Sequence, residues 1–140
     1  MSDRITNLYN QYIEMPLANR IELSRRSYAK MEEEFKKAYD SWKGYNYAID
    51  CALLISYMAG ISETTYNLFL RTSGKTPSYS DFSNGACNCA RNQDAIIRSV
   101  NMKHDDLIVA VSYYALTICA CKGSLTDRDR NLINKFLTRK

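Results

Sequence analysis

An apolar side chain recurs every seven residues near the start of the chain, at Ile21, Tyr28, Phe35 and Trp42. This spacing returns side chains to one face of an α-helix, in the manner of a coiled-coil seam. The pattern therefore predicts a long helix from residue 17 to 42 with one apolar stripe, which the polar Ser24 weakens. Gly44 is expected to end this helix.

The opposite face of this predicted helix is charged. Its charged residues are Lys30, Glu32, Glu33, Glu34, Lys36 and Lys37. Glutamate four residues before lysine is a favourable helical pair, so we expect this run to form a solvated face. A shorter helical pattern covers residues 4–14 and stops at Met15-Pro16, because a residue before proline avoids the helical region. We expect this first segment to be a short arm.

Two later stretches, residues 45–59 and 107–121, are almost wholly apolar, and each is followed by a glycine corner at Gly60 or Gly123. The second stretch is about 15 residues long, below the roughly 20 that a membrane span requires. Both are therefore predicted to be buried helices, and no membrane span is expected. Asp50 is the one charge in the first stretch, where we expect a hydrated or hydrogen-bonded edge.

The remaining pattern is also helical. Ser62 is a good N-cap for a helix that runs to Arg71. Residues 73–85 contain the loop signals Ser73-Gly74, Pro77 and Asn84-Gly85 and form the longest predicted irregular stretch. A single helix is predicted for residues 86–100, and His104 or Asp105 is expected to cap the next one. No segment alternates as a strand does, so the fold class is all-α, a compact helical bundle.

The chain contains an internal repeat, in which residues 48–71 correspond to residues 111–135. Gly60 aligns with Gly123, and the pair Ser62-Glu63 aligns with Thr126-Asp127. Each copy reads as a buried helix, a glycine in a left-handed cap, and a hydroxyl N-cap with an acid in the next first turn. The sequence thus predicts two pseudo-repeated helix-corner-helix units plus a long N-terminal helix.

This corner pattern is similar to that of TerB-like domains, the tellurite-resistance-related helical domains with two such repeats. The resemblance covers roughly residues 45–140 and leaves residues 1–44 as an N-terminal extension of a single domain. In that family an aspartate precedes the glycine and a glutamate lies three residues after the hydroxyl cap, and these acids are associated with divalent cations. Here Ala59 and Lys122 occupy the aspartate positions, and Thr65 and Asp129 the glutamate positions.

Composition adds few constraints. The length of 140 residues is that of one domain, and the net charge of +4 comes from 19 basic and 15 acidic residues that are interspersed. The five cysteines are an odd number and the N-terminus is polar, so reduced thiols in the cytoplasm are the simplest interpretation.

The candidate chemistry is sparse. Cys87 and Cys89, with Cys119 and Cys121, form two C-x-C pairs that could offer four thiolates to zinc. Two residues separated by one other lie about 200° apart around a helix, which favours small buried thiols over a metal site. His104 is the only histidine. We therefore expect no enzyme and no cofactor.

A basic C-terminal edge is the remaining candidate for partner binding. It consists of Lys122, Arg128, Arg130 and Lys135, followed by Arg139 and Lys140, and is diluted by Asp127 and Asp129. Clustered cations can meet nucleic acid or an acidic partner. Asp127 and Asp129 are also the weak candidates for a metal site.

The leading functional hypothesis is a cytoplasmic, non-catalytic helical module that binds a protein partner, in a stress-response or defence setting that the TerB-like resemblance implies. One alternative is a divalent-cation-sensing module built on Ser124, Thr126, Asp127 and Asp129. Another is a nucleic-acid binder that uses the basic C-terminal edge, although nucleic acid is the less favoured partner. The long N-terminal helix is expected either to pack on the repeats or to pair with its copy in a homodimer.

Overall fold

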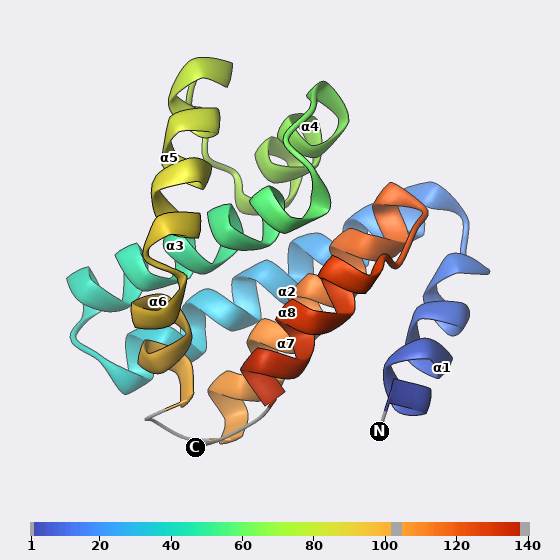
Figure 1. The fold of residues 1–140 in the computed structure, drawn as a ribbon, viewed down its shortest axis with the longest axis horizontal. Coiled ribbons are helices and arrows are strands. Elements are labelled where there is room, and N and C mark those ends of the chain that lie inside the picture. The colour runs from blue at the N-terminus through green and yellow to red at the C-terminus, as the bar shows by residue number, and fades with distance from the viewer. Residues whose placement is uncertain (1, 102–104, 138–140) are drawn as a thin grey trace.

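The computed structural model describes residues 2–101 and 105–137, and within these ranges the chain forms helices and no strand (Figure 1). The helices are α1 (Ser2–Ile13), α2 (Leu17–Ala38), α3 (Ser41–Ala59), α4 (Glu63–Ser73), α5 (Tyr79–Arg91), α6 (Gln93–Asn101), α7 (Asp105–Lys122) and α8 (Asp127–Leu137). The predicted all-α helical bundle is confirmed. None of the helices in the described ranges has the length and apolarity that a membrane span requires.

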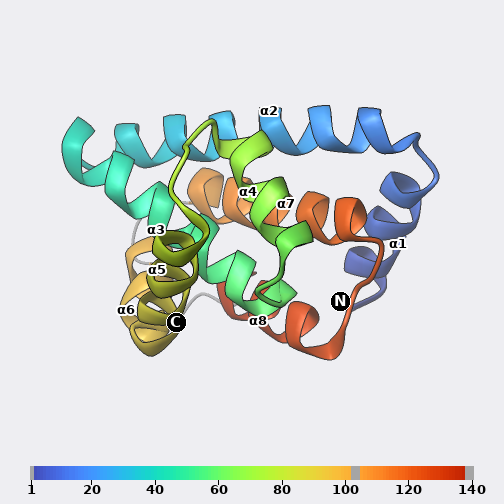
Figure 2. The ribbon, with the colours of Figure 1, turned by 90° about the horizontal axis from the view of Figure 1, so that it is seen from above.

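Helix α7 lies at the centre of the bundle. It contacts α1, α2, α3, α4, α6 and α8, and its contact with α2 is the most extensive between any two helices. The two helices run side by side along the molecule (Figure 2). Only Asp105, Asp106, Val109 and Tyr113 of α7 are exposed. The apolar stretch predicted to form a buried helix is therefore the core of the fold.

Helices α1 and α2 of the N-terminal extension pack on the rest of the chain, as in the first of the two expected arrangements. Ser24, which interrupts that stripe, is fully buried and accepts a hydrogen bond from Thr117 Oγ1 at 3.1 Å. The ring of Tyr28 meets that of Tyr114 edge to face at 5.4 Å. Tyr114 in turn shares a 2.8 Å hydrogen bond with Thr72 of α4. These contacts bury the stripe inside the protein, so it is not a free surface for pairing with a second copy.

The predicted single helix over residues 17–42 is wrong at its end. Helix α2 stops at Ala38, and Asp40 starts α3 by accepting the Lys43 backbone N–H at 3.2 Å. Trp42 therefore leaves the stripe and is 72% exposed. Gly44, expected to end a helix, lies inside α3, where a Cβ atom would stand 2.6 Å from the backbone oxygen of Phe35. A glycine is needed here because the two helices touch through their backbones.

The charged run on α2 is also not uniformly solvated. Glu34 is only 3% exposed, and its carboxylate pairs with Lys30 at 2.9 Å and Lys37 at 3.6 Å. The hydrogen bond from Lys30 is the main cause that lowers the pKa of Glu34, against a smaller opposing effect of burial. The two lysines therefore keep a buried carboxylate charged.

The predicted irregular stretch of residues 73–85 shrinks to residues 74–78, because α5 already begins at Tyr79. Asn84-Gly85, expected to be a turn, lies within this helix, and a Cβ atom on Gly85 would stand 3.2 Å from the Leu53 side chain. The helix predicted for residues 86–100 is two helices, which meet at Asn92. The sequence predicts His104 or Asp105 as the cap of α7, but Asp105 is already helical and lies in the first turn, so it is not the cap. His104 lies outside the described residues.

Helix α1 is joined to α2 through the predicted break at Met15-Pro16. Arg20 of α2 holds this junction, because its Nε donates to the Met15 oxygen and its Nη1 to the Ala120 oxygen, each at 2.8 Å. The second bond also satisfies a carbonyl in the last turn of α7, where helical partners run out. The body of α1 contacts α7 and, less extensively, α2.

The two helical glycines allow a matched test of the α2–α3 contact. Gly44→Ala should lower the free energy of unfolding by about 2 kcal/mol, because its Cβ must displace backbone atoms. Gly85→Ala meets only a flexible leucine side chain and gains helix propensity, so its stability should stay within about 1 kcal/mol of wild type. Urea unfolding followed by circular dichroism measures both, and equal effects would contradict the proposed backbone contact.

Candidate functional site

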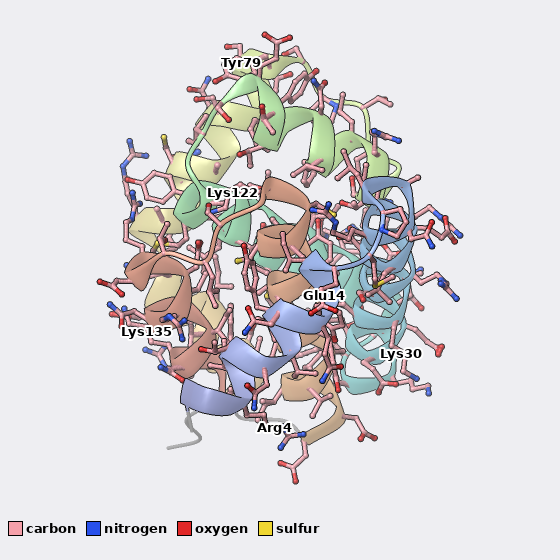
Figure 3. The ribbon with its side chains drawn as sticks, turned by 90° about the vertical axis from the view of Figure 1, so that its right-hand side faces the viewer. Arg4, Glu14, Lys30, Tyr79, Lys122 and Lys135 are labelled. Carbon is pink, nitrogen blue, oxygen red and sulfur yellow. The ribbon has the colours of Figure 1, made fainter. Side chains whose placement is uncertain are left out.

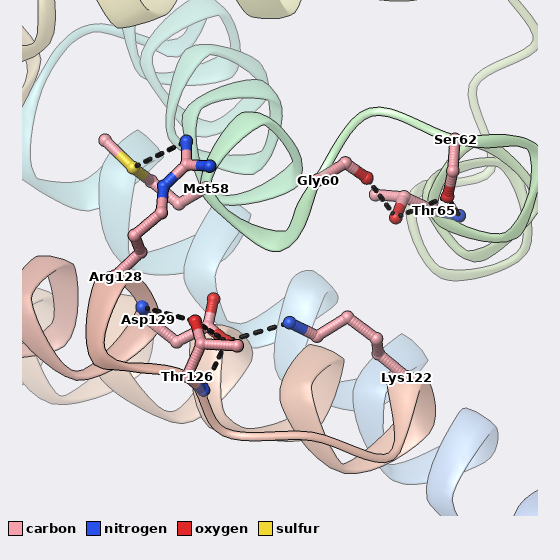
Figure 4. Close-up of polar contacts among 8 residues, drawn as sticks. All are labelled: Met58, Gly60, Ser62, Thr65, Lys122, Thr126, Arg128 and Asp129. Carbon is pink, nitrogen blue, oxygen red and sulfur yellow. Dashed lines mark hydrogen bonds and ion pairs between the residues drawn. The ribbon is translucent and has the colours of Figure 1, made fainter.

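Both predicted corners are present, and each begins with a glycine of positive φ. With ψ 113°, Gly60 does not adopt the left-handed cap that the sequence predicts. Gly60 has φ +100° and Gly123 has φ +88°. In the first corner, Ser62 accepts the Thr65 backbone N–H at 3.3 Å, and Thr65 Oγ1 donates to the Gly60 oxygen at 2.7 Å (Figure 4). Two hydroxyls thus tie the first turn of α4 to the end of α3.

In the second corner a carboxylate takes the place of one hydroxyl. Asp129 Oδ2 accepts the Thr126 backbone N–H at 3.0 Å, the Thr126 hydroxyl at 2.9 Å and the Lys122 ammonium at 2.8 Å (Figure 4). The Asp129 N–H donates back to Thr126 Oγ1 at 3.2 Å. This reciprocal pair is a capping box, and the lysine joins it to the last turn of α7.

The Lys122–Asp129 pair is largely removed from water, with side chains 13% and 4% exposed. Both residues were singled out from the sequence, Lys122 as a partner-binding cation and Asp129 as a metal candidate. The structure brings them together, so the ammonium is the cation at Asp129, and a divalent ion would first have to displace it. Asp127 is exposed in the first turn of α8. No group of three or more metal-ligating side chains converges among the described residues.

The remaining cations of the predicted basic edge are dispersed around α8. Arg128 lies across the end of α3, with its guanidinium 5.7 Å from the Tyr57 ring centre and Nη2 3.9 Å from Met58 Sδ. Arg130 is half-buried and two residues from Arg128, hence about 160° away around the helix. Lys122 and Lys135 lie toward opposite ends of α8 (Figure 3). Arg139 and Lys140 lie outside the described residues.

The thiols are mostly buried, as the sequence predicts. Cys51, Cys89, Cys119 and Cys121 are buried, whereas Cys87 is half-buried, and all five are free. Burial is the first cause that raises the pKa of Cys89 and Cys119 to about 12 and that of Cys121 to about 11. Thiols held in this state are poor nucleophiles and poor metal ligands.

A groove lies between α2 and α7, and sequence reasoning missed it. It has a volume of about 510 Å³, and Arg26, Lys30 and Lys37 of α2 line one side. Val109 and Tyr113 of α7 lie on the other side, 46% and 37% exposed. Their spacing of four residues could have signalled an exposed stripe, but the surrounding apolar run hid it.

The same two α7 residues also border α1. Arg4, Ile5 and Leu8 of α1 line a smaller depression together with Val109 and Tyr113. Burial, with a smaller effect of the nearby Tyr113, raises the pKa of Tyr12 to about 12. The exposed stripe of α7 thus lies between α1 and α2, on which Figure 3 labels Arg4 and Lys30.

Comparisons of this chain with protein-family models, with curated proteins and with solved structures give no match.

The capping box and its lysine predict an asymmetric response to substitution. Asp129→Ala should lower the free energy of unfolding by about 3 kcal/mol, because it removes the cap and leaves a buried ammonium without a partner. Lys122→Met should cost about 1 kcal/mol, since Thr126 still satisfies the carboxylate. Ser62→Ala, in the neutral corner, should cost about 1 kcal/mol as a control. Urea unfolding measures all three, and a larger loss for Lys122→Met than for Asp129→Ala would contradict this assignment.

The burial of the cysteines predicts how many thiols react with a thiol reagent in the folded protein. In the folded protein one thiol per chain, Cys87, should react readily with an aromatic disulfide reagent, because the other four are buried. All five should react in denaturant. Cys87→Ser should abolish the fast phase, and several fast thiols in the native protein would contradict the buried arrangement.

Proposed function

We propose that this chain is a non-catalytic helical module, TerB-like in architecture, which binds a protein partner through the groove between α2 and α7. The observation that carries the proposal is the exposure of Val109 and Tyr113 within the stretch of α7 from residue 107 to 121, which is otherwise buried. Large apolar side chains gathered in a concave surface mark sites of interaction more often than scattered ones do. The α2 residues that line the groove run from Arg26 to Lys37, which is about three turns of the helix.

The partner segment is an amphipathic helix with acidic residues beside its apolar face. A helix that docks in a groove uses apolar anchors spaced by three or four residues, and such a row can pack against Val109 and Tyr113. The charges that line the groove are three cations, Arg26, Lys30 and Lys37, against two anions, Glu34 and Asp106, and give +1. Arg4 adds a further cation from the α1 side. An acidic rim on the partner would match this surface.

The setting proposed for this module is the cytoplasm, in a stress-response or defence process. Five free thiols support a reducing compartment. The process rests on the TerB-like resemblance of residues 45–140. The corner chemistry adds a reason for a structural rather than a catalytic role, because the polar groups of both corners are occupied by one another.

The test is affinity purification of the full chain from cells that express it, followed by binding measurements with the purified partner. The double substitution Val109→Ser and Tyr113→Ser should raise the dissociation constant about tenfold or more, because two apolar anchors are lost. Leu17→Ser is the matched control, since Leu17 is an exposed apolar residue of α2 outside the groove. Its dissociation constant should equal that of wild type.

Equal affinity of the double variant and wild type would refute the groove as the binding surface. Light scattering over a range of protein concentrations tests whether a second copy of this chain occupies the groove instead. A dimer that dissociates in the double variant but not in Leu17→Ser would assign the groove to self-association and overturn the proposal of a different partner.

A further inference from the structure

Asp50 is a half-buried carboxylate in the middle of α3, where every neighbour in sequence from Tyr45 to Ala59 is uncharged. Its Oδ1 accepts a long hydrogen bond from the Cys89 thiol, with a sulfur–oxygen distance of 3.7 Å. Among the described residues, no lysine or arginine forms an ion pair with Asp50, although nine such pairs occur elsewhere. A half-buried carboxylate without an ion-pair partner among these residues can accept a cation from outside.

The geometry of α5 brings polar side chains to this carboxylate. Gly85 lets α5 approach α3 at Leu53, and Cys89 and Asn92 follow it on the same face, four and seven residues later. The chain then turns at Asn92, whose backbone oxygen accepts the Ile96 N–H of α6 at 3.1 Å. Helices α3, α5 and α6 thereby enclose a pocket of about 330 Å³.

The pocket presents hydrogen-bond acceptors and an aromatic ring. Its polar lining residues are Tyr47, Asp50, Asn88, Cys89, Asn92 and Ser99. The Asn92 amide nitrogen donates to the Asn88 backbone oxygen at 3.0 Å, which leaves the Asn92 amide oxygen as an acceptor. Tyr39 holds the wall in place, since its hydroxyl donates to the Ser99 backbone oxygen at 2.5 Å and its ring lies 4.6 Å from that of Tyr47.

The two hydrogen-bonded residues of the lining, Asp50 and Cys89, differ in charge. Burial raises the pKa of Asp50, an effect that the thiol hydrogen bond opposes. Burial, followed by the charge of Asp50, raises the pKa of Cys89 to about 12, so the thiol remains a neutral donor. A carboxylate can accept about four hydrogen bonds, and a single thiol at 3.7 Å satisfies little of that capacity. The carboxylate therefore keeps acceptor capacity for a cation that carries several donors, and the nearby Arg91 is bonded to Asn88 instead.

We infer that the pocket between α3, α5 and α6 binds the charged end of an alkylammonium compound, with the Asp50 carboxylate as its ion-pair partner. An ammonium group carries three donors, which the Asp50, Asn92 and Ser99 oxygens can accept. Tyr47 lies in the same lining, and a tyrosine ring can attract a cation. This site shares no residue with the corners or with the lining of the α2–α7 groove, so either proposal can fail without the other.

The experiment is a titration of the ¹⁵N-labelled full chain followed by amide chemical shifts. The probes are n-butylammonium, Nα-acetyl-lysine amide, and n-butanol as the uncharged control. The expected result is saturable shifts centred on Asp50, Cys89 and Asn92 with the ammonium probes and none with butanol. If only butylammonium binds, the ligand is a free amine; if the lysine derivative binds as well, the pocket also accepts a lysine side chain of a polypeptide. Both results support the site.

Asp50→Asn keeps the size of the side chain and removes its charge, so it should weaken binding about tenfold or more. Glu63→Gln removes an exposed charge on α4 as a matched control and should bind as wild type does. Ala95→Leu, an exposed lining position, narrows the pocket while it keeps Asp50, and should also weaken binding, which tests the site even if Asp50→Asn is unstable. Unchanged binding by Asp50→Asn and Ala95→Leu, equal shifts with butanol, or no shifts at all would overturn the inference.

Discussion

The need to cover α7 on nearly all sides determines the rest of the structure. An apolar helix of 18 residues cannot face water, and a single partner helix covers only one of its sides. Six other helices contact it, which explains why the N-terminal extension is part of the bundle rather than an appendage. The small hydroxyl residues Ser24 and Thr117 meet where α2 and α7 approach, and they satisfy each other there. Without α2, one entire flank of α7 would be exposed.

The two corners show how one structural task is performed with different chemistry. In each, a residue in the first turn of the second helix is bonded to the last residues of the first. Thr65 does so through a neutral hydroxyl, and Asp129 through a carboxylate that needs Lys122 as its counter-ion. The lysine and the aspartate are therefore a coupled pair, and a change at either position alone leaves a charge in a place from which water is largely excluded.

Periodicity identified the helices and the two glycine corners, because these depend on local chain properties. Periodicity failed where a residue is required by its contact with another helix. Gly44 and Gly85 read as helix ends or turns, yet they lie inside helices and admit a neighbouring backbone or leucine side chain. Trp42 matched the apolar stripe but follows a break set by the Asp40 cap. Periodicity did not predict the α2–α7 groove either. Val109 is exposed because of where α1 and α2 pack against α7, which the local pattern does not contain.

The unequal anchoring of α1 has a consequence for local unfolding. Its junction to α2 is fixed by Arg20, whereas its body contacts little besides α7. Segments held by one neighbour open at a lower free energy than a core helix, so amide hydrogens of α1 exchange with solvent ahead of those of α7. Opening about the Met15-Pro16 junction uncovers the apolar side chains of Leu116 and Ile133 beneath α1. We therefore expect a larger surface next to Val109 in molecules in which α1 has opened.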